Sequence, residues 1–415
     1  MKMKKNSRLL WVLAGVLFAF TPANNENEFI NGQLSGGASR LKKMLVTANG
    51  VDTLFPRTTD KQGHLKLTDK YDWTSGFFPG SLWYAYEATK EEILKAEAIK
   101  WTEKLAALQT FTGHHDLGFM MYCSYGNAYR LTGKEEYKNI LIQSAKSLAT
   151  RFSAKTGSIK SWNNFGSWDG KNKYNYPVII DNMMNLELLF FASRVTGDAQ
   201  YKNIAVQHAT TVLKNQLRPD YSCYHVVCYD AGTGAVLARE TAQGYSDNST
   251  WARGQAWGIY GFTMTYRETR EKRFLTAAQK MADFYLNQKT LPSDKVAYWD
   301  FNANEVGYQP SVKSHAPEAA AKYRDASAAA ITASALLELS TFLGSKGEKY
   351  KQAAINILHA LSSPVYLAPE GQNGDFILKH SVGSIPHSSE IDVPLVYADY
   401  YYLEALSRYR SLVAR

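Results

Sequence analysis

Two aspartates stand where long connecting segments give way to apolar helical segments, and both could carry acid–base chemistry. Asp116 follows two histidines, and Asp181 follows the apolar run Val178-Ile179-Ile180. A carboxyl group removed from water has a raised pKa, which suits a general acid near neutral pH. At the same ends of neighbouring helices, the pair would protonate one atom and position water at another. The alternative for each aspartate is a helix cap that accepts hydrogen bonds from first-turn amides.

A third group of residues has the chemistry to bind an acidic sugar. Arg253 and Trp257 are four residues apart in the run Trp251-Ala252-Arg253-Gly254-Gln255-Ala256-Trp257, so they share one face of a helix. An arginine beside an aromatic plane can hold a sugar carboxylate while the indole stacks on the ring. The structural alternative is a tryptophan in the core and an arginine in a salt bridge.

Other chemistries lack a signature in this sequence. His225 lies in an apolar, strand-like stretch, residues 224–229, where a lone histidine is more often structural than catalytic. His114, His115 and Asp116 are adjacent, but chain neighbours rarely all face one ion, so we expect no metal and no cofactor. The sequence has no glycine-rich phosphate loop, no serine nucleophile elbow and no Cys–His signature.

The first residues have the features of an export signal. A basic start is followed by an apolar run at residues 9–20 and by Thr21-Pro22-Ala23. The run is short for a membrane span, which needs about 20 residues, and no lipid-anchoring cysteine follows it. We therefore predict a cleaved signal peptide at residues 1–23 and a periplasmic or secreted protein that does not associate with a membrane after cleavage.

Composition limits the partner classes. The chain has 415 residues, 45% hydrophobic and 20% charged, with a net charge of +9. Four positive charges belong to the predicted signal peptide, and no dense basic stripe follows, so a nucleic-acid partner is not expected. Three cysteines are too few for a disulfide scaffold. A Cys223–Cys228 bridge is conceivable, and free, buried thiols are the favoured alternative.

A recurring phrase organises the rest of the chain. Thr132-Gly133-Lys134-Glu135-Glu136-Tyr137 returns as Thr196-Gly197-Asp198-Ala199-Gln200-Tyr201, with looser copies near residues 89, 269 and 344. Each copy ends one helix and begins the next, which describes a helical hairpin. An apolar helix precedes each copy, as at 119–131, 183–195, 251–266 and 326–343. A more amphipathic one follows, as at 137–152, 201–217, 274–288 and 350–361.

With helices at 27–48 and 391–408, the pattern predicts about twelve helices in six pairs. An inner ring sheathed by an outer ring explains the alternation, so the predicted fold is an all-α toroid of six hairpins, with residues 24–415 as one catalytic domain. The alternative is an open helical solenoid, whose repeats are usually shorter and more regular. Binding groups are expected in the long connections before inner helices, at 69–79, 153–181, 218–250 and 292–325.

These residues resemble the unsaturated glucuronyl hydrolases of glycoside hydrolase family 88, over about residues 71–409. The resemblance rests on the order and spacing of Asp72-Trp73-Thr74-Ser75-Gly76-Phe77, His115-Asp116-Leu117-Gly118-Phe119, Ile180-Asp181-Asn182-Met183-Met184-Asn185, the Trp251 to Trp257 run, Arg324-Asp325-Ala326-Ser327-Ala328-Ala329 and Ala398-Asp399-Tyr400-Tyr401-Tyr402-Leu403-Glu404-Ala405. It implies an (α/α)6 barrel. It also implies release of the unsaturated uronic acid that polysaccharide lyases leave on oligosaccharides, by hydration of the C4=C5 double bond.

The resemblance also implies roles for individual residues. Asp181 corresponds to the proton donor that activates water, and Asp116 to the assisting aspartate. The implied sugar-binding residues are Trp73, His115, Trp162, His225, Gln243, Arg253 and Trp257. The implied partner is an unsaturated uronate oligosaccharide, expected to derive from a glycosaminoglycan. Heparin, chondroitin, hyaluronan and gellan or xanthan fragments all present this uronate. Lys379, His380 and His387 are candidates to face the leaving sugar.

Two other functions stay open at this point. An unsaturated rhamnogalacturonyl hydrolase would use the same barrel and proton donor on pectin fragments, although the His115-Asp116 pair favours the glucuronyl branch. A non-catalytic saccharide-binding toroid would use the same aromatic residues while the aspartates only cap helices. The sequence does not define the preferred glycan, the sulfation pattern or the oligomeric state.

Overall fold

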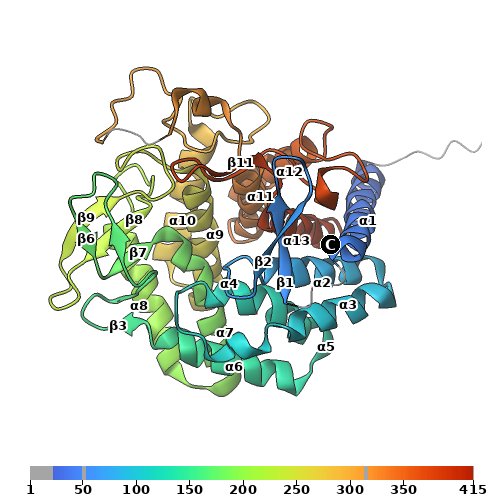
Figure 1. Cartoon of the computed structure of the whole chain (residues 1–415), viewed down its shortest axis with the longest axis horizontal. Helices are drawn as coiled ribbons and strands as arrows, with labels where there is room; N and C mark the ends of the chain where they lie inside the picture. Colours follow the sequence, from blue (N-terminus) through green and yellow to red (C-terminus); the bar gives the residue numbers. More distant parts are fainter. Residues whose placement is uncertain (1–21, 49–52, 313–315, 415) are drawn as a thin grey trace, which may run out of the picture.

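The computed structural model describes residues 22–48, 53–312 and 316–414. The predicted signal peptide, residues 1–23, lies outside these ranges except for its last two residues, which begin helix α1 (Pro22–Ala48). Over the described ranges, every helix is too short or too polar to cross a membrane. Figure 1 shows the helices set around a central region, with β6 to β9 at the left of the view and β1 and β2 near its centre.

Six apolar helices of the described chain form a closed inner ring, because each packs on the next and the last packs on the first. One of them is composite, with a π-helical segment (Tyr122–Gly126) between two α-helical parts. Another begins with a 3-10 segment (Ile180–Asn185). The inner helices are α2 (Phe77–Thr89), α4 (Leu117–Met121) with α5 (Asn127–Thr132), α7 (Leu186–Thr196), α9 (Ala252–Thr269), α11 (Ala326–Thr341) and α13 (Val396–Val413).

Six amphipathic helices sheathe this ring in the described part of the chain. In α10, Phe274, Ala278, Met281 and Tyr285 recur at helical spacing and are buried, while the opposite face is polar. The outer helices are α1, α3 (Glu92–Glu103), α6 (Glu135–Ala149), α8 (Ala199–Asn215), α10 (Lys272–Asn287) and α12 (Glu348–Leu361). The predicted all-α toroid of six hairpins, an (α/α)6 barrel, is confirmed, and the open solenoid is excluded by the closed ring.

The recurring phrase turns the chain between paired helices through a left-handed residue. Gly133 and Gly197 follow α5 and α7 with φ of 67° and 76°, and their N–H groups donate to Tyr129 and Ser193 carbonyls. Lys90 and Arg270 adopt the same conformation after α2 and α9, with φ of 60° and 59°. A left-handed residue after the last turn satisfies helix carbonyls that have no partner in the helix. The phrase is therefore a C-cap signal.

Short antiparallel strands occupy the connections that precede inner helices. β7 (Pro177–Ile179), β8 (Val226–Tyr229) and β9 (Val236–Glu240) form one sheet. The remaining pairs are β1 (Leu54–Thr59) with β2 (Leu65–Asp69), β3 (Phe152–Ser153) with β4 (Ser158–Ile159), β5 (Phe165–Gly166) with β6 (Lys173–Tyr174), and β10 (Ser381–Ser384) with β11 (Ser389–Val393). These strands hold the long loops at the mouth of the barrel.

The predicted last helix begins later than expected. Residues 391–393 belong to β11, and α13 starts at Val396 rather than at residue 391. The reason is Pro394, because proline lacks an amide donor and restricts the residue before it to extended conformations. The prediction of a helix at 391–408 is corrected at its start by five residues, and the helix continues to Val413.

Candidate active site

The two predicted aspartates line one cavity at the ends of the inner helices where those helices begin. Asp116 immediately precedes α4, and Asp181 is the second residue of the 3-10 segment that leads into α7. The cavity has a volume of about 480 Å³, within the range of small-ligand pockets. Its described lining is Trp73, Asp116, Trp162, Asn164, Phe165, Gly166, Trp168, Ile179, Asp181, Ala242, Gln243, Arg253 and His387.

Close backbone packing fixes the 3-10 segment that carries Asp181. A Cβ atom at Gly118 of α4 would lie 2.4 Å from the Asn185 Cα, and one at Gly261 of α9 would lie 2.4 Å from the Met183 Cβ. The Phe119 amide also donates to the Asn185 Oδ1 at 2.8 Å. The segment is therefore held from both sides, and glycine is required at these two close approaches.

Asp181 is a buried carboxyl group with one oxygen that makes no hydrogen bond to a described residue. Its pKa is raised to about 7 by burial, against the lowering effect of Arg253 and with a smaller upward contribution from the negative charge of Asp116. Among the described residues, its Oδ2 accepts no hydrogen bond. Ile179 and Ile180 precede it and are buried, which supplies the apolar setting. Asp181 can therefore hold a proton near neutral pH and present it to the cavity.

Asp116 has the opposite electrostatic setting. Its carboxylate lies 3.2 Å from the His114 Nδ1 and 3.3 Å from the His115 Nε2. Burial raises the pKa of Asp116, but these two histidines outweigh it and leave the pKa below its ordinary value. Asp116 occupies the N-cap position of α4, yet its side chain makes no capping hydrogen bond. The helix-cap alternative does not describe this carboxylate.

His225 stands behind Asp181 as a neutral imidazole of defined tautomer. Its Nδ1 accepts hydrogen bonds from the Ala242 and Gln243 amides at 3.1 and 3.2 Å, so the proton must be on Nε2. That Nε2 lies 3.8 Å from the Asp181 Oδ2. Burial holds the pKa of His225 well below its ordinary value, and Trp251 lies against the ring with centroids 4.4 Å apart. His225 is placed to orient Asp181.

His115 is also behind the cavity wall. Its side chain is completely buried, and burial lowers its pKa to about 4, so the ring is neutral. The Asn185 amide lies 3.3 Å from its Nδ1. His115 and His225 were both predicted to bind the sugar directly. The structure places each of them against a catalytic-candidate carboxylate and outside the described lining of the cavity.

Arg253 lines the cavity, but its guanidinium is already engaged. Nη1 pairs with the Asp325 Oδ2 at 3.1 Å and also donates to the Val382 carbonyl, and Nη2 donates to the Gly383 carbonyl at 2.7 Å. The Asp325 side chain in turn caps α11. The predicted role, binding a sugar carboxylate, would compete with these contacts. In this conformation Arg253 anchors β10 to the start of α11.

Trp257 differs from its predicted role as a stacking platform. Its side chain is completely buried and is absent from the described cavity lining. The ring packs against Phe119 and Tyr401 at centroid distances of 5.0 and 5.3 Å. Its indole N–H lowers the pKa of Asp181 in opposition to burial. Trp257 therefore supports the floor under Asp181, because a buried ring has no face left for a ligand.

The other predicted sugar-binding residues do reach the cavity. Trp73 and Trp162 are half-buried aromatic walls, and Gln243 donates from its amide to the Gly383 carbonyl at 3.2 Å. Trp73 packs against Tyr397 at a centroid distance of 4.8 Å, which limits its motion. Indole rings beside polar side chains suit a sugar, because pyranose rings have apolar faces and polar edges.

Some of the lining was missed or only partly foreseen. Trp168 and Phe165 line the cavity from the connection at 153–181, which the sequence marked as a functional region without selecting them. His387 was one of three candidates to face the leaving sugar, and it lies 4.8 Å from the Trp168 ring by centroids. Of the other two, His380 contacts Asp392 at 2.6 Å and Lys379 donates to the Pro364 carbonyl at 2.9 Å.

Metal ligands and thiols add no further chemistry to this cavity. Within the described residues, no group of three or more histidine, cysteine, aspartate or glutamate side chains is arranged to hold a metal ion. Cys123, Cys223 and Cys228 are free and buried, so the conceivable Cys223–Cys228 bridge is not formed. The arrangement supplies a neutral carboxylic acid, an ionised carboxylate and aromatic walls around one cavity, which equips it for acid–base chemistry on a sugar.

Comparison with known proteins agrees with this chemistry. The sequence profile of Glycosyl Hydrolase Family 88 matches residues 48–410. The chain is 45% identical over 393 residues to an unsaturated glucuronyl hydrolase of Formosa agariphila, covering 94% of this chain and 93% of that protein. It is 34% identical to an unsaturated chondroitin disaccharide hydrolase of Streptococcus agalactiae, covering 89% of each.

A solved structure shows the same fold over nearly the whole length. It is an unsaturated glucuronyl hydrolase described as specific for heparin, and it superposes with a TM-score of 0.85 at 44% sequence identity. The match covers 94% of this chain and 99% of that one.

Proposed function

The chain belongs to Glycosyl Hydrolase Family 88, and we propose that Asp181 is the acid that starts its reaction. The enzyme is a glycoside hydrolase. It releases the 4,5-unsaturated uronic acid from the non-reducing end of the oligosaccharides that polysaccharide lyases produce, as its relatives named for unsaturated glucuronyl and chondroitin substrates do. The observation that carries the proposal is the Asp181 carboxyl group, which burial keeps protonated up to about pH 7 while it lines the sugar-sized cavity.

The proposed chemistry starts from a weak base. The C4=C5 double bond of the uronate is a vinyl ether, so its protonation needs an acid that is neutral at working pH. Asp181 gives its proton to C4, which leaves positive charge on C5 and the ring oxygen. Water then adds to C5, and its proton returns to the Asp181 carboxylate. The resulting hemiketal opens by cleavage of the bond between C5 and the ring oxygen, which gives a ketone at C5 and a hemiacetal at C1. The hemiacetal collapses to an aldehyde and releases the second sugar as an alcohol.

The neighbouring residues have distinct roles in this proposal. Asp116 stays ionised between His114 and His115, so its charge favours the protonated form of Asp181. The Nε2–H of His225, 3.8 Å from the Asp181 Oδ2, holds the carboxyl group in position when it becomes charged. Trp73 and Trp162 confine the uronate ring from the cavity walls.

The charges that line the cavity also indicate whether the leaving sugar is sulfated. Among the described lining residues, the only basic side chains are Arg253, which is paired with Asp325, and His387, whose pKa burial lowers. A sulfate group would find no unpaired cation there. We therefore propose that unsulfated disaccharides of glycosaminoglycan type are the preferred substrates.

A panel of lyase-generated disaccharides tests both parts. Sulfated and unsulfated heparin, chondroitin and hyaluronan disaccharides are offered at equal concentration, with a rhamnogalacturonan disaccharide as the pectin control. Turnover is followed as loss of the ultraviolet absorbance of the conjugated uronate. We expect turnover of unsulfated glucuronyl substrates first. Preference for sulfated forms contradicts the proposal on the leaving sugar, and turnover of the pectin disaccharide alone favours the rhamnogalacturonyl alternative.

Export is a separate proposal. The basic start, the apolar run and Thr21-Pro22-Ala23 support a signal peptide and a periplasmic or secreted location. Such a location suits the trimming of oligosaccharides that extracellular lyases release. N-terminal sequencing of the protein from a periplasmic fraction tests this, and a mature protein that retains residues 1–23 in the cytoplasm contradicts it.

A further inference from the structure

A second cavity lies at the opposite end of the inner helices. It has a volume of about 640 Å³, larger than the cavity with Asp116 and Asp181. Its lining includes Glu87, Arg130, Arg194 and Arg410, which lie in the last turns of α2, α5, α7 and α13. The Asp181 cavity is formed where inner helices begin, so the two cavities open at opposite ends of the ring.

The charges around this second cavity balance. Three glutamates and four arginines line it, and Arg267, Glu268 and Glu338 stand directly behind them. The set therefore contains five carboxylates and five guanidinium groups. Arg130 holds Glu87 through two contacts of 2.7 Å, and Arg408 lies 3.5 Å from Glu404. An ionic ligand would need an excess of the opposite charge, which this balanced set does not provide.

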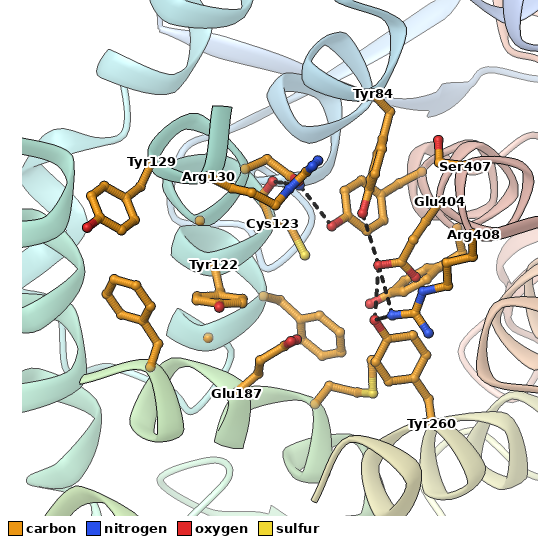
Figure 2. Close-up of a pocket in the computed structure, with 18 of the residues that line it drawn as sticks. Tyr84, Tyr122, Cys123, Tyr129, Arg130, Glu187, Tyr260, Glu404, Ser407 and Arg408 are labelled. Carbon is orange, nitrogen blue, oxygen red and sulfur yellow. Dashed lines mark hydrogen bonds and ion pairs between the residues drawn. The ribbon is translucent and has the colours of Figure 1, made fainter. Parts of the chain in front are cut away.

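The polar groups are arranged to exchange hydrogen bonds with hydroxyl groups. In Figure 2 the Tyr84 and Tyr260 hydroxyls point toward Glu404 from opposite sides, and they donate to its Oε1 at 3.1 and 3.0 Å. Tyr122 and Glu187 project from the facing wall. Among the described residues, the Ser407 Oγ has no hydrogen-bond partner although it is buried at this cavity. A buried hydroxyl without a partner is costly unless a ligand or water satisfies it.

An irregular stretch of helix shapes the wall. The π-helical segment Tyr122–Gly126 interrupts the inner helix formed by α4 and α5, and it turns the Tyr122 ring toward the cavity. Single π-helical turns are uncommon and frequently occur at functional sites. Phe191 packs near Tyr122, with ring centroids 5.7 Å apart, so the wall presents aromatic surface beside the ion pairs. Aromatic faces with balanced donors and acceptors match the two kinds of surface of a sugar.

We propose that this cavity is a second binding site, distinct from the active site, for a neutral saccharide of one or two rings. The aromatic wall at Tyr122 takes the apolar face of the sugar. The Ser407 hydroxyl and the Glu187 carboxylate exchange hydrogen bonds with its hydroxyl groups, while Glu404 holds the Tyr84 and Tyr260 hydroxyls in place. The site would bind a leaving sugar of the hydrolysis and not the uronate, because the charges of the lining and of the residues directly behind it balance.

The test uses the full-length mature protein with Asp181→Asn, saturated with a lyase disaccharide so that the active site is occupied. Glucose, N-acetylglucosamine and glucuronate are titrated, and binding is followed by saturation-transfer NMR. Two variants probe the site: Ser407→Phe fills it and Tyr122→Ala removes its aromatic wall. Lys202→Phe, at an exposed position of α8, is the matched control. Thermal unfolding verifies that each variant folds.

We expect saturable binding of a neutral sugar that Ser407→Phe and Tyr122→Ala each weaken about tenfold or more, and that Lys202→Phe leaves unchanged. The proposal is overturned by absence of saturable binding, by binding of glucuronate alone, or by equal affinity in both cavity variants and the parent. If the disaccharide does not occupy the active site, the proposed function fails. The second site is still decided, because the Ser407 and Tyr122 variants locate it independently.

Discussion

The two ends of the barrel bury carboxylates in opposite ways. Where the inner helices end, Glu338 is paired with Arg267 and Arg408, and these charges outweigh burial and keep its pKa below the ordinary value. Where the inner helices begin, Asp181 is buried without a hydrogen bond to Oδ2 from any described residue, and its pKa rises to about 7. The fold can satisfy a buried carboxylate, so the one left unpaired at the mouth has a chemical rather than a structural purpose.

The largest difference between the ends should appear in turnover. Asp181→Asn removes the transferable proton while keeping the shape of the side chain, and general acid catalysis supplies about 10²–10⁴-fold in rate. We expect turnover to fall by at least that factor while the unsaturated disaccharide still binds. Turnover is measured as loss of the uronate absorbance, and binding of the disaccharide is measured by calorimetric titration. A near-normal rate in this variant removes Asp181 from the proposed role.

The corresponding change at the far end should cost stability. In Glu404→Gln, an amide N–H₂ faces the hydroxyl donors and Arg408 in place of a carboxylate. We expect a loss of about 1–3 kcal/mol in the free energy of unfolding, measured by urea denaturation. Glu92→Gln on exposed α3 is the matched control and should change it by less than about 0.5 kcal/mol. Equal effects of the two changes contradict the contrast.

Asp181→Asn should raise the free energy of unfolding relative to wild type, where Glu404→Gln lowers it, and the gain should appear only at high pH. The pKa of Asp181 rises from 3.8 to about 7 on folding, so its contribution to wild-type stability is full below pH 4 and is lost as pH rises to about 7. Asparagine does not titrate and escapes this loss. We expect the variant to gain about 2.5 kcal/mol relative to wild type between pH 5 and pH 8. Urea unfolding at both pH values measures this, and a constant difference argues against a buried acid.

A smaller effect is expected from the second aspartate. Asp116→Asn removes a negative charge that raises the pKa of Asp181, so less of the acid is protonated above neutral pH. We expect kcat/KM at pH 8 to fall roughly tenfold, with a smaller loss at pH 5.5. Asp60→Asn, in the exposed β1–β2 turn, is the control. An equal loss at both pH values would mean that Asp116 acts otherwise than through the charge on Asp181.

Much of this contrast could be predicted from the sequence, because it depends on local signals. The turn phrase around Gly133 and Gly197 marks where helices pair, and the loop-to-helix boundaries before α4 and α7 place Asp116 and Asp181 at the same end. The apolar residues before Asp181 also predicted its raised pKa. These features depend on residues within a few positions of one another.

Other features depend on contacts between distant segments. Arg253 donates to the Gly383 carbonyl, 130 residues further along the chain, and no local pattern reveals that its guanidinium is engaged. The burial of Trp257 follows from the packing of Phe119 and Tyr401 around it. Trp168 reaches the cavity because its loop folds back over the mouth of the barrel. The π-helical segment contains Gly126, but one glycine does not separate it from an ordinary helix in the sequence.

The pH dependence of kcat/KM on an unsulfated disaccharide tests the central claim most directly, because it reports the protonation state of the free enzyme. If Asp181 acts as a buried acid with a pKa of about 7, kcat/KM is level on the acidic side and falls about tenfold per pH unit above neutrality. Asp116→Asn should move this descending limb to lower pH. A kcat/KM that stays level or rises up to pH 9 would contradict the account.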